Sequence, residues 1–326
     1  MDKIALKRIF IIPLVLILVL ASGCSLFKKT QEKVEKSVEE VREQVVESTK
    51  KAVEQVKQGI KEQVKEQLDP QKVFGKDSIN LVYFGLDKNE EREKTLGSFR
   101  TDTIIIMHLD FVNKKAGVLS IPRDTYVPIA NKNYSDKINH AFPFGGGIDG
   151  DGFQNSLDTI SGFLGGVTLD RYFATDMSVI APVVDAMGGV EYDVDVEYTK
   201  GGYNLTKGLQ ILDGKKAEQY VRFRKTANGD IDRVQRQQKF FLALIKQASR
   251  KVKLEEGMEI YKEVKGQTYS NLSIKEMMAL GTFIKGINFD SIECYYVKGS
   301  FMNKNGISYW NPDMEYVKEI TEKLGL

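Results

Sequence analysis

The chain has 326 residues, of which 42% are hydrophobic, so it is long enough to bury a substantial core. Lysine and arginine total 47 against 45 aspartates and glutamates, and this balance argues against a non-specific nucleic-acid binder, which needs a basic excess. Two cysteines and two histidines exclude a disulfide-stapled scaffold and a His- or Cys-rich metal centre. Any metal is therefore expected to be a hard cation bound by carboxylates.

The N-terminus has the pattern of an export signal. Three basic residues lie within the first eight positions, the apolar run Ile9–Ala21 follows, and Ser22-Gly23-Cys24 completes the pattern. The last four residues of this segment, Ala-Ser-Gly-Cys, resemble a bacterial lipobox, which predicts removal of residues 1–23 and lipidation of Cys24. The alternative is an uncleaved, single-pass membrane anchor. Both interpretations tether the chain to a membrane and place the rest of it outside the cytoplasm.

Residues 24–69 differ sharply in composition from the rest of the chain. Between Ser25 and Asp69 we count ten basic and ten acidic residues, and valines recur at a spacing of three to four. The pattern predicts a helix from about residue 30 to 68, roughly 58 Å long at 1.5 Å per residue, which we call the stalk. The stalk is either a coiled coil that forms oligomers or a solvated spacer. The stripe is mostly valine, and its only leucine is Leu68 at the end of the predicted helix, which favours the spacer.

Residues 70–326 are expected to form one globular domain, because strand-like and helix-like segments alternate along them. Strands are predicted at 79–86, 103–109, 117–121, 190–196 and 291–297, and helices at 153–164, 177–187, 215–220, 232–250, 274–286 and 313–324. This alternation favours a three-layer α/β fold around a central mixed sheet.

Charged residues follow the predicted strands at one edge of this sheet. Asp87 ends the first strand and Asp102 begins the second, so an antiparallel pair would place both carboxylates at the same edge. A hairpin into the third strand would return Arg123 to that edge, near Arg100. Two carboxylates suit Mg²⁺, which takes few protein ligands and completes its shell with water and phosphate oxygens. Taken singly, each aspartate could equally cap a loop, and each arginine could form a surface ion pair.

A second cluster of charge spans residues 222–239, which carry six basic and two acidic residues. A helix is predicted to begin near Asp232, with one face formed by Arg233, Arg236, Gln237 and Phe240. Cations in the first turn of a helix oppose the helix dipole, but an anion bound there would stabilise the arrangement. Arginine also matches phosphate oxygens with bidentate geometry. We therefore predict a phosphate site, with a solvated basic face as the alternative.

Five short motifs follow one another along the chain: Gly85-Leu86-Asp87, Arg100-Thr101-Asp102-Thr103, Ile121-Pro122-Arg123-Asp124-Thr125, Lys137-Ile138-Asn139-His140-Ala141 and the block from Arg222 to Gln238. Together and in this order they resemble the LytR-CpsA-Psr family of mainly Gram-positive bacteria. The resemblance is close over about residues 74–250 and looser towards the C-terminus. It implies a three-layer α/β/α fold with an apolar tunnel for a lipid tail.

The resemblance also implies an activity. Family members transfer a glycopolymer, such as teichoic acid or capsule, from an undecaprenyl-pyrophosphate carrier to peptidoglycan, at the outer face of the cytoplasmic membrane. Asp87 and Asp102 resemble the family's Mg²⁺ ligands, and Asp230 resembles a carboxylate that assists the incoming hydroxyl. The family's pyrophosphate clamp is matched by Arg100, Arg123, Lys137, Arg222, Arg224, Arg233 and Gln237. Of these, Arg123 and Arg233 are expected, with Asp230, to be essential for transfer.

The N-terminus departs from the family pattern, because members usually carry a transmembrane anchor rather than a lipobox and a stalk.

Two alternative functions remain open. A polyprenyl-pyrophosphate phosphatase would use the same site with water as the acceptor. A non-catalytic, lipid-binding envelope scaffold would bind the carrier without metal-dependent turnover. A transcriptional regulator conflicts with the export signal and with the absence of a helix-turn-helix pattern.

Overall fold

The structure is a computed structural model that describes residues 3–88, 99–227 and 229–326, without the side chains of residues 3–27, 61 and 65. The chain divides into two units, Met1–Glu66 and Gln67–Leu326, which are described separately.

The first unit consists of most of one helix, α1 (Lys3–Gln67), which confirms the predicted long helix. Its valine stripe is exposed along the described part, with Val38 at 59% and Val56 at 62% exposure. The predicted signal segment 1–23 and the predicted lipidation site Cys24 lie outside the described side chains. Among the residues whose side chains are described, no helix has a stretch long and apolar enough to cross a membrane. Oligomerisation through the stalk remains a prediction.

A short helix with Pro70 in its first turn lies near the start of the second unit. Asp69 ends the connection after α1, and its carboxylate accepts a hydrogen bond from the N–H of Gln71 at 3.0 Å, which caps the short helix α2 (Pro70–Phe74). Pro70 lies in the first turn of α2, where a missing N–H has no consequence for the helix.

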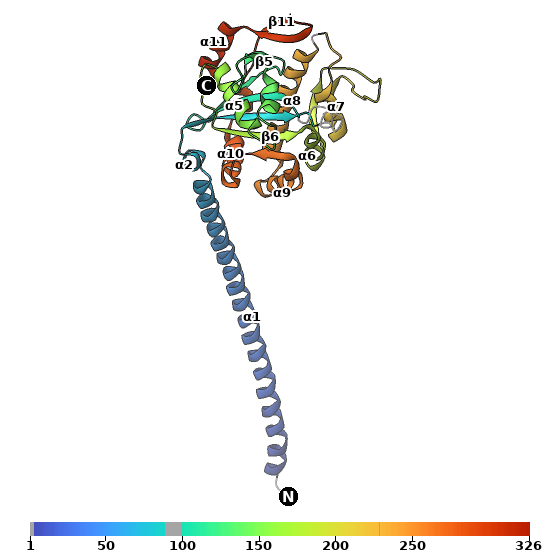
Figure 1. The fold of residues 1–326 in the computed structure, drawn as a ribbon. Helices are drawn as coiled ribbons and strands as arrows, with labels where there is room; N and C mark the ends of the chain where they lie inside the picture. The colour runs from blue at the N-terminus through green and yellow to red at the C-terminus, as the bar shows by residue number, and fades with distance from the viewer. Residues whose placement is uncertain (1–2, 89–98, 228) are drawn as a thin grey trace. The chain divides into compact units, whose positions relative to one another are not determined.

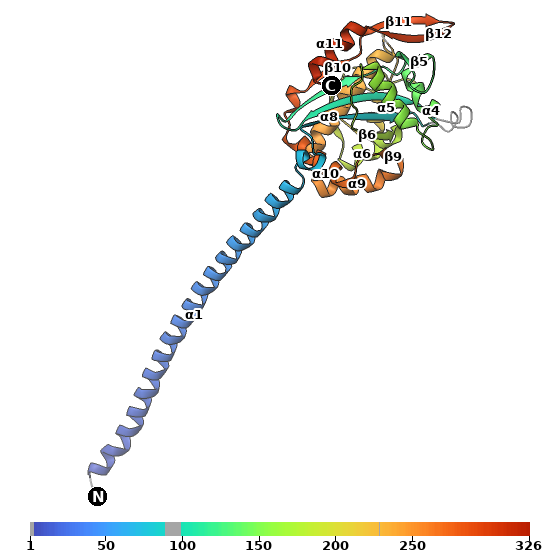
Figure 2. The same ribbon diagram turned by 60° about the vertical axis from the view of Figure 1, so that its left-hand side comes forward.

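A six-stranded sheet forms the centre of the second unit (Figures 1 and 2). Its strand order is β10 (Glu293–Tyr296), β3 (Lys115–Ser120), β2 (Thr101–Asp110), β1 (Ser78–Leu86), β6 (Arg171–Asp176) and β9 (Thr268–Ser270). The β1–β2, β2–β3 and β6–β9 pairs are antiparallel, whereas β1–β6 and β3–β10 are parallel. The predicted mixed sheet is therefore confirmed.

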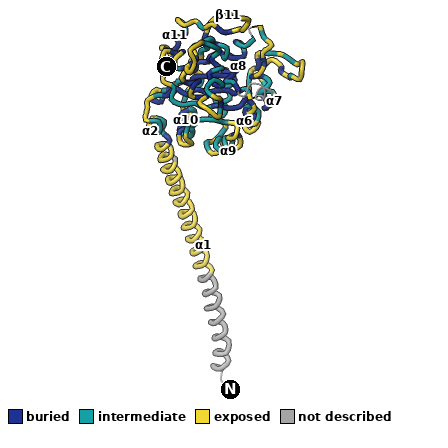
Figure 3. The backbone as a smooth tube through the Cα atoms, viewed as in Figure 1, coloured by how far each residue is buried: buried dark blue, intermediate teal, exposed yellow. Residues whose placement is uncertain are grey.

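Helices cover both faces of the sheet, which gives the three predicted layers. One face packs against α4 (Ala141–Phe144), α5 (Gly152–Phe163) and α11 (Met314–Leu324). The other face lies under α8 (Asp230–Lys251), α9 (Leu254–Val264) and α10 (Ile274–Gly286). Side chains of β1 alternate between the two cores: Val82 and Phe84 lie in the first, and Ile79 and Leu81 in the second. Buried residues accordingly follow the sheet in Figure 3.

Shorter elements complete the unit. Among the described residues, three hairpins lie outside the central sheet: β4 (Tyr126–Pro128) with β5 (Ser135–Lys137), β7 (Val190–Val194) with β8 (Gly208–Leu212), and β11 (Gly299–Lys304) with β12 (Ile307–Pro312). The other helices that the structure describes are η1 (Ile138–His140), η2 (Met177–Val179), α6 (Ile180–Ala186), α7 (Gly214–Arg222), η3 (Lys265–Gln267) and η4 (Phe289–Ser291). The strand predicted at 190–196 thus exists as β7 but pairs with β8, not with the central sheet.

Candidate functional site

The end of β1 and the start of β2 lie side by side at one edge of the central sheet. Leu86 pairs with Thr101 in the antiparallel register, and the N–H of Asp87 donates to the carbonyl of Arg100 at 3.1 Å. Asp87 therefore comes directly after the last residue of β1, and Asp102 is the second residue of β2. Both lie at the same edge of the sheet, as strand polarity predicts. Of the two carboxylates, Asp102 is almost completely buried, at 4% exposure.

The third strand returns the chain to this edge. Ile105 in β2 pairs with Ser120 in β3, so the residues that follow Ser120 lie beside the start of β2. Arg123 is among them, and its Nη1 donates a hydrogen bond to Oδ2 of Asp102. Its Nη2 lies 3.4 Å from Oδ1 of Asp230. A single guanidinium thus contacts two carboxylates from distant parts of the sequence.

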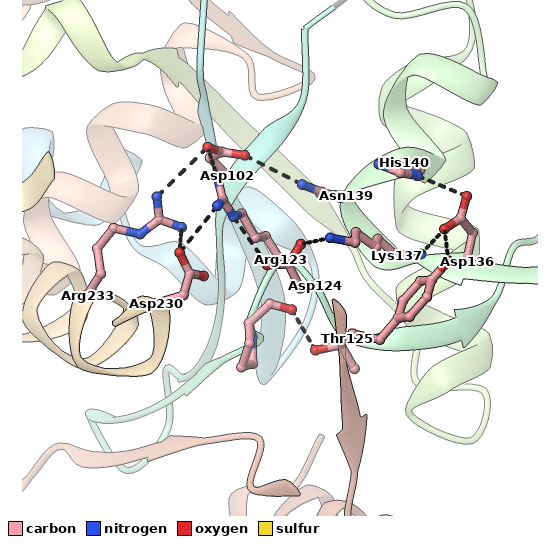
Figure 4. Close-up of polar contacts among 12 residues, drawn as sticks. Asp102, Arg123, Asp124, Thr125, Asp136, Lys137, Asn139, His140, Asp230 and Arg233 are labelled. Carbon is pink, nitrogen blue, oxygen red and sulfur yellow. Dashed lines mark hydrogen bonds and ion pairs between the residues drawn. The ribbon is translucent and has the colours of Figure 1, made fainter. Parts of the chain in front are cut away.

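Two more arginines reach the same carboxylates from the region of α7 and α8. Arg233, in the first turn of α8, places Nη2 at 2.8 Å from Oδ1 of Asp230 and Nη1 at 3.9 Å from Oδ2 of Asp102. Arg224, between α7 and α8, places Nη2 at 3.4 Å from Asp102 and Nε at 3.9 Å from Asp230. We call Asp102, Arg123, Arg224, Asp230 and Arg233 the Arg–Asp cluster, much of which is drawn in Figure 4.

The Arg–Asp cluster holds Asp102 ionised. Burial alone would raise the pKa of its carboxyl, but the charges of Arg123, Arg233 and Arg224 outweigh burial and lower that pKa below its ordinary value. Burial likewise opposes the charge of Arg123, but Asp102 and Asp230 raise the pKa of that guanidinium above its usual range. Both groups are therefore charged at neutral pH.

Arg233 is the most deeply buried cation of the cluster. It is 2% exposed, its Nη2 is ion-paired with Asp230, and its Nε makes no described hydrogen bond. Burial, together with the neighbouring cations Arg123 and Arg224, lowers the pKa of Arg233 to about 10 despite the carboxylate of Asp230. With three guanidinium groups against two carboxylates, the cluster carries an excess positive charge. A further anion would relieve this excess and satisfy the unpaired N–H group.

A second set of polar contacts extends from the cluster along β4 and β5. Asp124 lies 3.7 Å from Nε of Arg123 and 2.7 Å from Nζ of Lys137. Lys137 therefore joins the cluster through Asp124, as Figure 4 shows. Asn139, in η1, donates through Nδ2 to Oδ1 of Asp102 at 3.5 Å. The sequence motifs contained Asp124 and Asn139, but their chemistry alone assigned them no role.

Some predicted clamp residues do not enter the cluster among the described contacts. Arg222 pairs with Glu218 of its own helix at 3.1 Å. The guanidinium of Arg100 forms no described ion pair with Asp102 or Asp230, although its backbone lies at the same edge. Arg236, from the same basic block, is buried away from the cluster, where it donates to the carbonyl of Phe223 at 2.9 Å. The roles of Arg100 and Arg222 remain predictions.

Gln237 marks the border between the charged cluster and an apolar cavity. It lies one helical turn after Arg233, and its Oε1 accepts a hydrogen bond from Oγ1 of Thr103 at 3.0 Å. Thr103 and Gln237 both line the cavity, which has a volume of about 510 Å³ between the sheet and helices α8, α9 and α10. Most of its other lining residues are apolar, including Leu81, Ile105, Ile245, Met258, Met278 and Ile284.

The close packing at this border depends on Gly85. A Cβ atom at this position would lie 2.8 Å from Cβ of Thr103 and 3.3 Å from Sδ of Met177. The distance to Thr103 is shorter than Cβ contacts in proteins allow, and the distance to Met177 is tight, so an alanine at position 85 would displace Thr103 at the border between the charged cluster and the cavity. The glycine of the Gly85-Leu86-Asp87 motif therefore has a packing role.

Known proteins resemble this chain over most of its length. The model of the LytR_cpsA_psr family matches residues 43–325. The polyisoprenyl-teichoic acid–peptidoglycan teichoic acid transferase TagU of Bacillus subtilis (strain 168) is 31% identical over 250 residues, which cover 76% of this chain and 78% of TagU.

Two solved structures have the same fold as this chain. The crystal structure of B. subtilis TagV matches with a TM-score of 0.64 at 29% identity, covering 77% of this chain and 98% of TagV. The structure of TagT bound to LI-WTA matches with a TM-score of 0.63 at 28% identity, covering 79% of this chain and 93% of TagT.

The electrostatics of Asp102 predict a specific pH dependence of stability. Its folded pKa is lowered from an unfolded value of about 3.9, so the ionised group stabilises the fold at neutral pH. That contribution is lost as the pH falls through the folded pKa. We expect Asp102→Asn to lower the free energy of unfolding by about 3 kcal/mol at pH 7, and the deficit to shrink below about pH 4. Urea unfolding followed by circular dichroism at several pH values measures both.

The matched control is Asp158→Asn, because Asp158 is an exposed residue of α5 outside the cluster. It should change the free energy of unfolding by less than about 0.5 kcal/mol at any pH. A deficit for Asp102→Asn that is equally large at pH 7 and at acidic pH would contradict the electrostatic account.

Proposed function

The chain belongs to the LytR-CpsA-Psr family, and on this premise we propose that it is a phosphotransferase that moves a glycopolymer from a polyprenyl pyrophosphate to peptidoglycan. One observation carries the proposal: a cluster with excess positive charge borders an apolar cavity of about 510 Å³. A polyprenyl pyrophosphate has the matching chemistry, since a doubly charged head group adjoins a long hydrocarbon tail. The cavity volume lies within the usual range of ligand pockets.

The relatives support the choice of substrates. TagU is named for transfer of teichoic acid from a polyisoprenyl carrier to peptidoglycan, and TagT has been solved bound to LI-WTA. We therefore propose an undecaprenyl-pyrophosphate-linked glycan as the donor, with teichoic acid, capsule or a similar polymer as the glycan. Peptidoglycan is the proposed acceptor.

The reaction exchanges a phosphoanhydride bond for a phosphoester bond. A sugar hydroxyl of peptidoglycan attacks the phosphorus that carries the glycopolymer, the bond from that phosphorus to the bridging oxygen breaks, and polyprenyl phosphate leaves. The proton of the hydroxyl passes to Asp230, whose Oδ1 is ion-paired with the cluster arginines, whereas its Oδ2 accepts no described hydrogen bond. Arg123, Arg224 and Arg233 neutralise the charge that develops on the leaving phosphate, which is the main contribution that a protein makes to phosphoryl transfer.

The residues at the sheet edge fit a hard divalent cation. All three cluster arginines pair with Oδ2 of Asp102, so Oδ1 of that carboxylate faces Asn139 instead. Asp87 supplies a second carboxylate at the same edge, and no group of three or more histidine, cysteine, aspartate or glutamate side chains is assembled within the described residues. Mg²⁺ suits such a site, because it often binds one or two carboxylates. When bound, it would help neutralise the pyrophosphate.

We expect the arginines to be essential for transfer. Arg123→Ala and Arg233→Ala should each lower the rate by at least about 100-fold, because each removes a preorganised charge from the transferring phosphate. The assay incubates the protein with a defined lipid-pyrophosphate glycan, Mg²⁺ and peptidoglycan oligomers, and measures the product by mass spectrometry.

Arg250→Ala is the matched control, since Arg250 is exposed at the far end of α8. It should retain parental activity. A parental transfer rate for either Arg123→Ala or Arg233→Ala would contradict the role of these arginines in binding the pyrophosphate. A parallel reaction without peptidoglycan separates the alternatives: rapid release of the glycan into water indicates a phosphatase, and binding without turnover indicates a scaffold.

The cavity predicts a dependence on tail length. Ala248 lines it from α8, and Ala248→Trp would fill part of it. We expect this variant to raise KM for donors with long polyprenyl tails by about tenfold or more, since apolar contact area is lost. Donors with a two-isoprene tail should be affected little, because they occupy less of the cavity. An equal effect on short and long donors would show that the cavity does not bind the tail.

We propose that the protein acts at the outer face of the cytoplasmic membrane, tethered by a lipid on Cys24, with the stalk as a spacer. In a Gram-positive host, the parent should incorporate labelled palmitate and Cys24→Ser should not. Membrane-bound parent protein that takes up no palmitate would instead support the single-pass anchor.

A further inference from the structure

The side chain of Asn139 is buried and fixed beside the Arg–Asp cluster. It is 2% exposed, and its backbone N–H donates to the carbonyl of Arg123 at 3.2 Å. The preceding residue, Ile138, donates its N–H to the carbonyl of Thr125 at 2.8 Å. Two successive backbone hydrogen bonds therefore hold η1 against the segment that carries Arg123, and they orient the carboxamide towards Asp102 (Figure 4).

The carboxamide is poorly satisfied in this position. Its Nδ2 lies 3.5 Å from Oδ1 of Asp102, at the outer limit of a hydrogen bond. Its Oδ1 is buried and makes no hydrogen bond. A buried amide oxygen without a donor is unfavourable, and most such atoms in proteins find a partner. The orphaned oxygen therefore calls for a ligand that the protein does not itself supply.

The two oxygen atoms of Asp102 have different surroundings. Oδ2 receives the guanidinium groups of Arg123, Arg224 and Arg233. The described contact of Oδ1 is the long one from Asn139. The arginines thus leave one carboxylate oxygen open beside a buried carboxamide, and oxygens from carboxylates and amides are the donors that hard cations prefer.

We propose that Asn139 is a ligand, through its Oδ1, of the divalent cation at this site, beside Oδ1 of Asp102. The carboxamide can present either its Nδ2 or its Oδ1 to Asp102 by turning about its terminal bond. In the structure Nδ2 faces the carboxylate, and as a cation ligand the carboxamide would present Oδ1 instead. This inference rests on the proposed function, because that function requires the cation.

The rival explanation is that Asn139 only positions Asp102 by donating through Nδ2. Substitution by aspartate separates the two roles, because an aspartate can bind a cation but cannot donate to Asp102 when ionised. A ligand role predicts that Asn139→Asp keeps or strengthens cation binding. A positioning role predicts that Asn139→Asp weakens binding at least as much as Asn139→Ala does.

The test measures Mn²⁺ binding to the full chain in detergent by electron paramagnetic resonance, with Mg²⁺ as the competitor and no substrate. We expect Asn139→Ala to raise the Kd for Mn²⁺ by about tenfold, and Asn139→Asp to bind at least as tightly as the parent. Asn155→Ala is the matched control: Asn155 is also buried, and its Nδ2 donates to the carbonyl of Ala141 at 2.6 Å. It should leave the Kd unchanged.

Each other outcome overturns the inference. If the parent binds Mn²⁺ and both Asn139 variants bind it equally well, Asn139 is not a ligand, and the proposed function stands. If both variants bind Mn²⁺ more weakly than the parent and Asn139→Asp binds no more tightly than Asn139→Ala, Asn139 is a positioning residue. If the parent binds no Mn²⁺ at millimolar concentration, both the inference and the Mg²⁺ dependence of the proposed function fail. Circular dichroism of each variant confirms folding, and Asn139→Asp alone decides between the roles if Asn139→Ala does not fold.

Discussion

The rest of the site depends on the contact of three arginines with the carboxylates of Asp102 and Asp230. Arg123, Arg224 and Arg233 each have an N–O distance of 3.9 Å or less to both carboxylates. The carboxylates compensate the burial of Arg123 and Arg233, whereas the side chain of Arg224 is 42% exposed and is screened by solvent. Three guanidinium groups against two carboxylates leave an excess positive charge, and this excess supports the proposed phosphate site.

The position of the cluster indicates which kind of ligand it can bind. It lies where the charged edge of the sheet meets the apolar space beneath α8, and Thr103 and Gln237 separate the two. A molecule that bridges this border must have a charged head and an apolar tail. In the proposed reaction, the Asp230 carboxylate is the proton acceptor and Oδ1 of Asp102 is a cation ligand, both on the side of the head group. The proposed binding and chemistry therefore use the same few side chains.

Strand polarity allowed much of the site to be predicted from the sequence. An antiparallel β1–β2 pair and the return through β3 bring Asp87, Asp102 and Arg123 to one edge, and the start of α8 brings Arg233. Which arginines of the basic block enter the cluster depends on three-dimensional packing, and the spacing of residues along a helix does not predict it. Arg222 and Arg236 belong to the same basic block as Arg233 but face elsewhere.

Strand β6 was not predicted because its short run is half buried, and β7 was assigned to the wrong sheet because pattern alone does not identify a strand's partner.

The proposed reaction is tested most directly by ³¹P nuclear magnetic resonance of the products formed from a lipid-pyrophosphate glycan and peptidoglycan oligomers. We expect a phosphodiester between glycan and peptidoglycan, together with an equal amount of polyprenyl monophosphate. A phosphorus-free glycosidic product, with release of polyprenyl pyrophosphate, would contradict it.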